Sequence, residues 1–509
     1  MGVAIVLRVN MAASSAAVEM LGCCRRRPFP LSFSSFSASS TQSGSFMWRA
    51  PPLLTRGCIR LISTESRDSE QTEIQTQTSH SIAPLVKRLF EFQRPGRHHE
   101  TNLNQLERLR QLVLNLETNN SKETALETLQ SGIVPSLLRL KEMAPHEVRK
   151  QANMALSLLG YTPPYKGKGL KILAIDGGGT RGLIPIIILQ QLEQVSGIKV
   201  HEMFDYVSGT STGTLILTLV FLEKVSIQEA EVFYRELSSK IFKMNNLLGI
   251  GQLFLTQSFY SSSDLEKQVR KFSVTGRKLY ETSCDPTMPK MSFLSTLVNQ
   301  PVIEPFLFTN YHHHPLTSSH YLSSSNTPIW QSIMASTAAP GYFEEVKIGP
   351  YIYQDGGILT NNPAAVALHE ARHLWGCDVP VQTLISLGTG QFEYDRNNPV
   401  SPVSSNISLR EKLTKIVASA TDTEAVHTIL KDLLPQSSYF RFNPHLTEQI
   451  NLDNCNPEQL QKIVDDTKRY LENNESLLNE AAASLTKQKS FQQKLFERYK
   501  CRKTAWPNR

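Results

Sequence analysis

The sequence has no apolar stretch that approaches the roughly 18–20 residues needed to cross a bilayer as a helix. Its longest apolar runs, residues 184–189 and 215–222, have the length of elements buried in a globular core. The sequence therefore does not predict an integral membrane protein, and we expect any contact with a membrane to be peripheral.

Cysteine is scarce, with seven residues in 509 and no CxxC pair. An odd, dispersed set predicts free thiols rather than a disulfide framework. No group of cysteines and histidines has zinc-site spacing, and no Asp-rich loop indicates calcium. We therefore expect no metal and no cofactor, with metal binding by the adjacent histidines 312–314 as the alternative to a plain loop.

Lysine and acidic residues are almost missing from residues 1–64, which hold seven arginines, one glutamate and no lysine. This segment carries a net charge of +6, whereas the remaining 445 residues carry +1. An Arg-rich, Ser-rich, acid-poor start is typical of a transit peptide, so we predict a disordered mitochondrial presequence. A disordered tail without a targeting role is the alternative. The nearly neutral remainder gives no indication of nucleic-acid binding.

Residues 65–81 are polar and predict a linker, and residues 82–164 have a helical pattern of apolar residues. One amphipathic segment carries Leu103, Leu106, Leu109, Leu112 and Leu114. Residues 132–160 resemble one armadillo repeat. A single repeat cannot bury its own apolar face. We therefore expect these helices to pack on their neighbours, and a protein partner or self-association through them remains open.

Residues 165–395 alternate between short apolar runs and helical patterns, which predicts an α/β fold with a mostly parallel sheet. Residues 396–509 predict a C-terminal helical extension that packs on this domain. The expected strands are residues 170–175, 204–208, 290–298, 306–311, 352–353 and 381–387. The expected helices are residues 183–195, 214–223, 329–336, 363–374, 410–434 and 458–499.

A short motif between a predicted strand and a predicted helix has the context of a nucleophile elbow. It consists of Gly209, Thr210, Ser211, Thr212 and Gly213. Glycines flank the serine because the turn is strained and crowded, and the helix N-terminus favours developing negative charge. The motif alone equally fits a glycine-rich turn without chemistry.

A second glycine-rich loop, residues 176–182 (DGGGTRG), also lies between a predicted strand and a predicted helix. Three consecutive glycines allow backbone N–H groups to converge on an anion. Arg181 adds a cation for an oxyanion or a phosphate. The loop also resembles the phosphate hairpin of sugar kinases and actin-like ATPases. The helical pattern after residue 182 and the elbow at Ser211 favour an acyl hydrolase.

Asp355 ends a Tyr/Ile-rich predicted strand and is followed by two glycines. A carboxylate in this position could accept the proton of Ser211, although an Asp-Gly turn alone is common. A Ser-Asp-His triad would need a histidine beyond the acid. The available residues are His369, His373, His427 and His445.

The three motifs, in this order and spacing, resemble the patatin-like phospholipase family. Residues 338–343 (AAPGYF), 386–390 (SLGTG) and 439–444 (YFRFNP) are similar to its calcium-independent phospholipase A2 gamma subgroup. The resemblance runs from about residue 170 to about residue 470 and implies a three-layer sandwich and a Ser-Asp dyad without a catalytic histidine. It implies Ser211 as nucleophile, Asp355 as base and an oxyanion region at Gly177, Gly178, Gly179, Arg181 and Gly182.

The expected activity is hydrolysis of fatty acyl esters of membrane glycerophospholipids through an acyl-enzyme. A neutral-lipid hydrolase or acyl transferase with the same dyad is the alternative, and an inactive scaffold is a further one. The chain ends in residues 506–509 (WPNR) rather than the peroxisomal Ser-Lys-Leu signal common in the subgroup. The sequence thus favours a mitochondrial location over a peroxisomal one.

Overall fold

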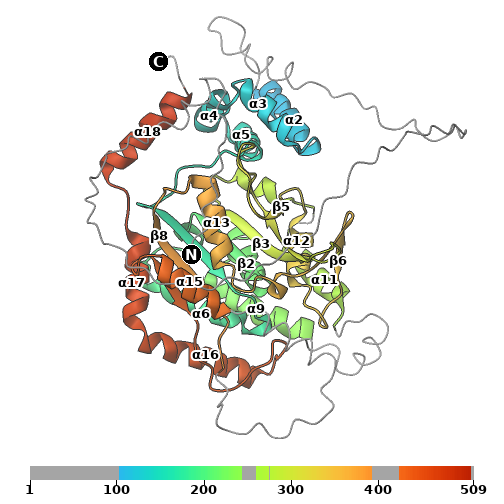
Figure 1. The fold of residues 1–509 in the computed structure, drawn as a ribbon, viewed down its shortest axis with the longest axis vertical. Helices are drawn as coiled ribbons and strands as arrows, with labels where there is room; N and C mark the ends of the chain where they lie inside the picture. Colours follow the sequence, from blue (N-terminus) through green and yellow to red (C-terminus); the bar gives the residue numbers. More distant parts are fainter. Residues whose placement is uncertain (1–101, 243–259, 274–275, 393–422, 506–509) are drawn as a thin grey trace, which may run out of the picture. The chain divides into compact units, whose positions relative to one another are not determined.

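The computed structural model describes residues 102–242, 260–273, 276–392 and 423–505 (Figure 1). The predicted presequence, the linker and the start of the helical region lie outside these residues, as do residues 410–422. Within the described part of the chain, no helix combines the length and the apolar character needed to cross a membrane.

The described chain contains a mixed sheet and surrounding helices. The strands are β1 Leu170–Ile175, β2 Tyr206–Thr210, β3 Lys290–Leu297, β4 Glu304–Thr309, β5 Leu322–Ser324, β6 Val346–Ile348, β7 Tyr351–Asp355, β8 Val381–Leu387 and β9 Tyr439–Phe442. The helices before β3 are α2 Asn102–Thr118, α3 Lys122–Gln130, α4 Val134–Met143, α5 His146–Leu158, α6 Leu183–Ser196, α7 Val200–Met203, α8 Thr212–Leu217, α9 Ile227–Phe242 and α11 Ser262–Phe272. Those after it are α12 Ile329–Thr337, α13 Ala364–Trp375, α15 Thr423–Leu433, α16 Pro457–Asn473, α17 Glu475–Thr486 and α18 Phe491–Ala505. Four shorter turns are η2 Gly179–Gly182, η3 Thr218–Leu222, η4 Leu279–Cys284 and η5 Gly356–Ile358.

The strands form one sheet in the order β5-β4-β3-β2-β1-β8-β9, and β7 pairs with both β3 and β6. The run from β3 through β2, β1 and β8 to β9 is parallel throughout. The β3–β4, β3–β7 and β6–β7 pairs are antiparallel. The sheet is therefore mixed and mostly parallel, which confirms the predicted fold class.

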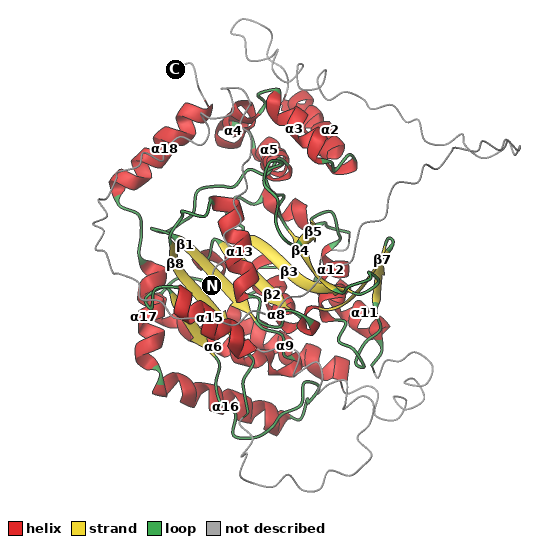
Figure 2. Ribbon diagram, in the orientation of Figure 1, coloured by secondary structure: helices red, strands yellow, loops and turns green. Residues whose placement is uncertain are grey.

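Both faces of the sheet are covered, which is the usual condition of a parallel sheet. In β1, Leu173 and Ile175 join a large apolar core with α6, α9, α16 and α17. The alternate residues Ile172 and Ala174 join a second core with α13 and α15. Figure 2 shows the strands at the centre of these helices. The result is a three-layer sandwich, helix–sheet–helix.

The loops that hold the three motifs emerge from one edge of this sandwich. β1 and β2 are parallel and in register from Ile172 opposite Tyr206 to Ile175 opposite Gly209. The residues that follow the two strands, Asp176 and Ser211, are therefore brought side by side. Such crevices outside the carboxyl ends of parallel strands are where α/β proteins bind ligands.

The N-terminal helices pack on the sandwich through η4. Their own apolar core includes Leu109, Leu112 and Val148, and Tyr280 of η4 belongs to it. The Tyr280 hydroxyl also donates a hydrogen bond of 2.6 Å to Glu117. These helices therefore have a small core of their own and also pack on the sandwich through Tyr280. Their likeness to an armadillo repeat stays a prediction.

Some predictions of helices, strands and buried residues were wrong, because contacts with other parts of the chain determine these features. Leu103 and Leu114 are 74% and 60% exposed, and the buried stripe of α2 comprises Leu109, Leu112, Val113 and Leu116. Residues 458–499 are not one helix but three, with breaks at Asn474 and at residues 487–490. In the region expected to be a helical extension, β9 adds an edge strand to the sheet.

We expect Ile188→Ala to lower the free energy of unfolding by about 2–5 kcal/mol, because the Ile188 side chain of α6 is completely buried in the large apolar core. Urea unfolding of the full chain measures the change. Val195→Ala on the same helix is the control, because Val195 is 44% exposed and its truncation should change the free energy by no more than about 0.5 kcal/mol. Equal losses in the two variants would contradict the assignment of the core.

Candidate active site

Ser211 lies on the turn between β2 and α8, and its backbone has φ 52° and ψ −115°. A non-glycine residue with positive φ at such a turn is strained and is common at functional sites. The turn is tight enough that a Cβ on Gly209 would lie 2.6 Å from the carbonyl carbon of Gly213. The Ser211 N–H donates a hydrogen bond to Ser336 Oγ at 3.1 Å, which holds the turn.

Asp355, the last residue of β7, faces this serine. The Ser211 hydroxyl donates a hydrogen bond of 2.6 Å to Asp355 Oδ2. The other carboxylate oxygen, Oδ1, accepts the N–H of Gly357 at 2.7 Å. The carboxylate is thus oriented by its own turn, with one oxygen aimed at the serine.

The Asp355 carboxyl is 5% exposed, and burial raises its pKa to about 6. The hydrogen bonds from Ser211 and Gly357 oppose this shift because they stabilise the charged form. Among the described residues, no cation lies close enough to lower the pKa of Asp355. The group is therefore a stronger base than an ordinary aspartate and is still ionised at neutral pH.

The glycine-rich loop after β1 supplies backbone donors beside the serine. No backbone carbonyl among the described residues accepts the N–H of Gly178 or Gly179, and both residues line the same cavity as Ser211. Gly177 differs from the prediction in one respect, because its N–H already donates to the Asn361 carbonyl at 3.2 Å. The available oxyanion donors are therefore those of Gly178 and Gly179.

The orientation of this loop depends on the elbow. Gly179 has φ 54°, which favours glycine, and its carbonyl accepts hydrogen bonds from Thr212 Oγ1 at 2.7 Å and from the Tyr234 hydroxyl. These two hydrogen bonds fix the Gly179 carbonyl, so the peptide units of the loop are held in place. Tyr234 is buried in α9 and gave no signal in the sequence.

The remaining predicted residues of the two loops have different positions. Arg181 lines the cavity, no described carboxylate forms an ion pair with it, and its Nε is buried without a partner. Gly182 lies under the loop, where a Cβ would meet the Tyr234 hydroxyl. Thr210 points away and donates to the Thr360 carbonyl at 2.8 Å. Arg181 is therefore a cation of the cavity, whereas Gly182 and Thr210 serve packing.

The cavity over Ser211 and Asp355 is walled mostly by apolar side chains and encloses about 1080 Å³, its open mouth included. The apolar wall consists of Leu215, Leu237, Ile241, Phe242, Leu265, Pro340, Tyr342, Phe343 and Leu452. These residues come from α8, α9, α11, residues 340–343 and Leu452. The polar lining residues include Ser211, Asp355 and Arg181, so the cavity suits a molecule with a long apolar part and a polar reacting group.

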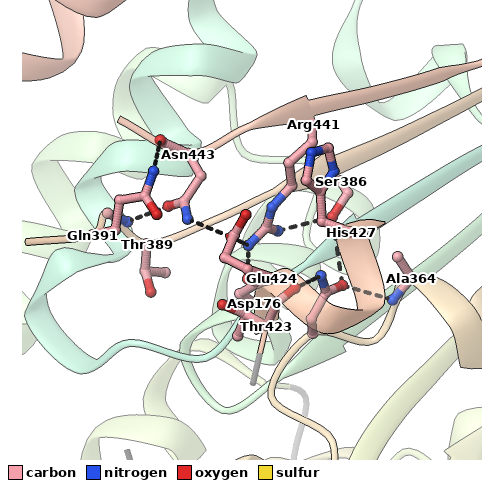
Figure 3. Close-up of polar contacts among 12 residues, drawn as sticks. Asp176, Ala364, Ser386, Thr389, Gln391, Thr423, Glu424, His427, Arg441 and Asn443 are labelled. Carbon is pink, nitrogen blue, oxygen red and sulfur yellow. Dashed lines mark hydrogen bonds and ion pairs between the residues drawn. The ribbon is translucent and has the colours of Figure 1, made fainter. Parts of the chain in front are cut away.

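A buried ion pair holds Asp176, the first residue of the glycine loop (Figure 3). Arg441 of β9 donates a hydrogen bond from Nη2 to Asp176 Oδ2 at 2.7 Å, and from Nη1 to Ser386 Oγ at 2.9 Å. The side chains of Arg441 and Asp176 are 4% and 2% exposed. Burial alone would lower the pKa of Arg441, but Asp176 and Glu424 hold it above its usual range.

The same guanidinium connects the loop to the start of α15. Arg441 Nη2 lies 3.2 Å from Glu424 Oε1, which also accepts the Asn443 side-chain amide at 3.0 Å. The Asn443 carbonyl oxygen Oδ1 accepts the Gly390 N–H at 2.9 Å. Arg441 and Asn443 belong to residues 439–444, the segment whose sequence is similar to the phospholipase A2 gamma subgroup. The segment alone did not indicate that these two side chains support the glycine loop, because their partners are distant in the chain.

The histidines considered for a triad all lie outside the cavity. His427 contacts the Tyr439 hydroxyl at 3.1 Å, His445 contacts the Gln391 side chain at 2.9 Å, and His373 contacts the His369 carbonyl at 2.8 Å. No histidine lines the cavity in the part of the chain that is described. Of the dyad and the triad, the geometry therefore supports the dyad.

Two further alternatives lose support from the geometry. The glycine loop leads through η2 into helix α6, whereas a sugar-kinase phosphate loop would lead into a second strand. His312 contacts Ser325 and His313 contacts Glu370, and no described group of three or more His, Cys, Asp and Glu residues has the arrangement of a metal site. The helix that follows the glycine loop therefore favours the acyl hydrolase over the sugar kinase.

Comparison with known proteins agrees with this geometry. The sequence profile of the patatin-like phospholipase family matches residues 173–368, a range that contains Asp176, Ser211 and Asp355. Residues 173–368 of the chain therefore form a patatin-like phospholipase domain.

Among individual proteins, the chain is similar to several phospholipases. Calcium-independent phospholipase A2-gamma of Rattus norvegicus is 40% identical over 368 residues, which are 72% of this chain and 47% of the rat protein. The protein of the same name from Homo sapiens is 40% identical over 368 residues, 72% of this chain and 46% of its own. Phospholipase A I of Arabidopsis thaliana is 28% identical over 414 residues, 69% of this chain and 31% of its own. The chain thus spans about half the length of the phospholipase A2-gamma proteins that it matches.

Among solved structures, VipD from Legionella pneumophila matches with 14% identity and a TM-score of 0.31, over 60% of this chain and 67% of that chain.

We expect Arg441→Met to lower the free energy of unfolding by about 3–5 kcal/mol, because the substitution leaves the buried Asp176 carboxylate without its cation. Urea unfolding measures the change. Arg110→Met is the matched control, because Arg110 and Glu107 form an exposed pair at 3.9 Å that should contribute at most about 1 kcal/mol. A similar small effect in both variants would show that the buried pair does not support the loop.

Proposed function

We propose that the protein is a calcium-independent phospholipase that hydrolyses fatty acyl esters of membrane glycerophospholipids through a Ser-Asp dyad. The observation that carries the proposal is the 2.6 Å hydrogen bond from Ser211 to Asp355, both of which line a mostly apolar cavity. The similarity to phospholipases A2-gamma supports the substrate class.

In the first half of the reaction, Asp355 accepts the proton of Ser211 as the serine oxygen attacks the ester carbonyl. Negative charge then develops on the carbonyl oxygen, within reach of the free N–H groups of Gly178 and Gly179. The loss of one such donor typically costs about 2.7–4 kcal/mol of transition-state stabilisation. When the intermediate collapses, protonated Asp355 returns its proton to the leaving lysophospholipid oxygen.

In the second half, Asp355 removes a proton from a water molecule that attacks the acyl-enzyme. The bond to Ser211 Oγ then breaks, Asp355 returns the proton to this oxygen, and the fatty acid leaves. The fatty acyl chain occupies the apolar wall, in which Leu237, Ile241 and Phe343 take part. Burial lowers the pKa of Arg181, whereas the nearby Tyr342 raises it. Within this scheme, Arg181 attracts the oxyanion or the lipid phosphate at the cavity.

The location and organisation of the protein belong to the same proposal. We propose a peripheral contact with membranes and a mitochondrial location directed by residues 1–64. The domain boundaries proposed from the sequence are a helical region at residues 82–164, a catalytic domain at 165–395 and an extension at 396–509. Packing of α5 against η4 supports a structural role for the helical region, and self-association or a protein partner through it stays a proposal.

We expect Ser211→Ala to reduce fatty acid release from phosphatidylcholine vesicles by about 10⁴-fold or more, because no other group can form the acyl-enzyme. Release is measured on a phospholipid with two distinguishable acyl chains, in calcium-free buffer. A fluorophosphonate probe should label the wild-type chain and leave Ser211→Ala unlabelled.

The matched control is Ser476→Ala, an exposed serine at the start of α17 that should keep full activity and labelling. Faster turnover of triacylglycerol than of phosphatidylcholine would favour the neutral-lipid hydrolase instead. Transfer of the acyl chain to an added alcohol in preference to water would favour the acyl transferase. Release at the wild-type rate by Ser211→Ala would end the dyad proposal.

We expect kcat/KM to fall about tenfold per pH unit below about pH 6 and to be level above it. Asp355 acts only when ionised, and its pKa is raised to about 6, so activity is present above this pH and is lost as the pH falls through it. The pH dependence of kcat/KM on a soluble ester measures this. His427→Asn should keep the same profile, because His427 lies outside the cavity. A midpoint near pH 4 would contradict the raised pKa.

A further inference from the structure

A second cavity lies between the N-terminal helices and the sandwich, apart from the site of Ser211. It encloses about 410 Å³, its open mouth included, and shares no lining residue with the first cavity. Lys141 of α4 and Ser157 of α5 line it on one side, and Lys290 and Asn310 on the other. Two lysines therefore line one small, partly open cavity.

Lys290 is the unusual member of this group. It is the first residue of β3 and is 7% exposed, yet no carboxylate among the described residues forms an ion pair with it. Its Nζ has Ser157 Oγ as a hydrogen-bond partner at 3.3 Å. An ammonium group has three donors, so donors remain for a ligand. A buried charge without a counter-charge is costly, and proteins normally pair such groups.

The surroundings of Lys290 add positive rather than negative charge. Burial and the Lys141 ammonium lower the pKa of Lys290 to about 7, so an anion in the cavity would stabilise the charged form. Burial also lowers the pKa of His312 to about 4, and the Lys290 charge contributes to that shift. The acid in the wall, Asp285, already binds Lys224 at 2.6 Å and the Thr287 N–H at 2.8 Å.

We propose that this cavity, which we call the lysine cavity, binds a phosphate-type oxyanion between Lys141 and Lys290. A phosphate group carries about −1.5 to −2 charges at neutral pH, and so supplies the counter-charge that no described carboxylate gives Lys290. Lysine is a common phosphate ligand because its compact ammonium donates several hydrogen bonds. The anion would connect α4 with the start of β3, and so couple the helical region to the sheet that holds the candidate active site.

The lysine cavity is tested by phosphate-dependent stability of the full chain. Thermal unfolding is followed over a series of inorganic phosphate concentrations, with sodium chloride keeping the ionic strength constant. We expect the unfolding midpoint of the wild type to rise with phosphate. Lys290→Met and Lys141→Met should each need at least about tenfold more phosphate for the same rise, because each loses one ammonium ligand.

Lys150→Met is the matched control, because Lys150 lies on α5 outside the lysine cavity and is paired with Glu147. It should respond to phosphate as the wild type does. Phosphate also stabilises proteins by exclusion from their surface, but that effect would be the same in all variants. An equal phosphate response in Lys290→Met and the wild type would therefore show that free phosphate does not bind between the two lysines, even if Lys290→Met is itself more stable.

A second arm separates free phosphate from a lipid headgroup. Co-sedimentation is compared for vesicles of phosphatidylcholine alone and of phosphatidylcholine with phosphatidate. The site would be assigned to the headgroup by two results together. Lys290→Met would lose the extra vesicle binding that phosphatidate gives the wild type, and inorganic phosphate would not raise the unfolding midpoint of the wild type. No dependence on Lys290 in either arm would overturn it. Both readouts measure binding, so their failure is distinct from a failure of Ser211 to hydrolyse lipid.

Discussion

The buried ion pair between Arg441 and Asp176 is the interaction on which the geometry of the glycine loop depends. Arg441 lies on the edge strand β9 and Asp176 follows β1, so the side chain must reach across β8. Ser386 on β8 lies opposite Arg441 in register and accepts a hydrogen bond at 2.9 Å along the way. Because Asp176 has almost no contact with solvent, the guanidinium is what makes a charged carboxylate tolerable there. The loop that follows is therefore anchored at its first residue, and its third and fourth residues keep their N–H groups beside Ser211.

Three buried charges of this chain show how surroundings decide what a titratable group can do. Asp176 is paired with Arg441 and serves to hold the backbone. Burial raises the pKa of both carboxyl groups to about 6, but Asp355 has only neutral donors, one of which is the Ser211 hydroxyl with which it can exchange a proton. Lys290 is buried beside another cation and keeps donors for a ligand. Each of the last two arrangements lowers stability relative to a paired group, which is the usual situation at functional sites.

Prediction from the sequence was accurate where a signal is local. Strands β1 and β8 have the predicted bounds, and α6 extends one residue past its predicted end, because a continuous apolar run or a regular period identifies an element without reference to its neighbours. Strand β9 was missed because Tyr439–Phe442 is only four residues long and becomes a strand by pairing with β8. Leu103 and Leu114 fit a helical period but remain exposed, because nothing packs on that side of α2 within the described residues.

The sequence by itself determined the chemistry available to this protein: a serine on a glycine-flanked turn, a glycine-rich loop and an aspartate that ends a strand. These are patterns of adjacent residues, and adjacent residues control turns and strand ends. Only the tertiary structure decided that Ser211 and Asp355 lie 2.6 Å apart, that Gly177 donates its N–H to Asn361 while Gly178 and Gly179 keep theirs, and that Lys141 and Lys290 share a cavity. The physical reason is that strand order and register set distances between residues more than a hundred positions apart, and no local pattern encodes them.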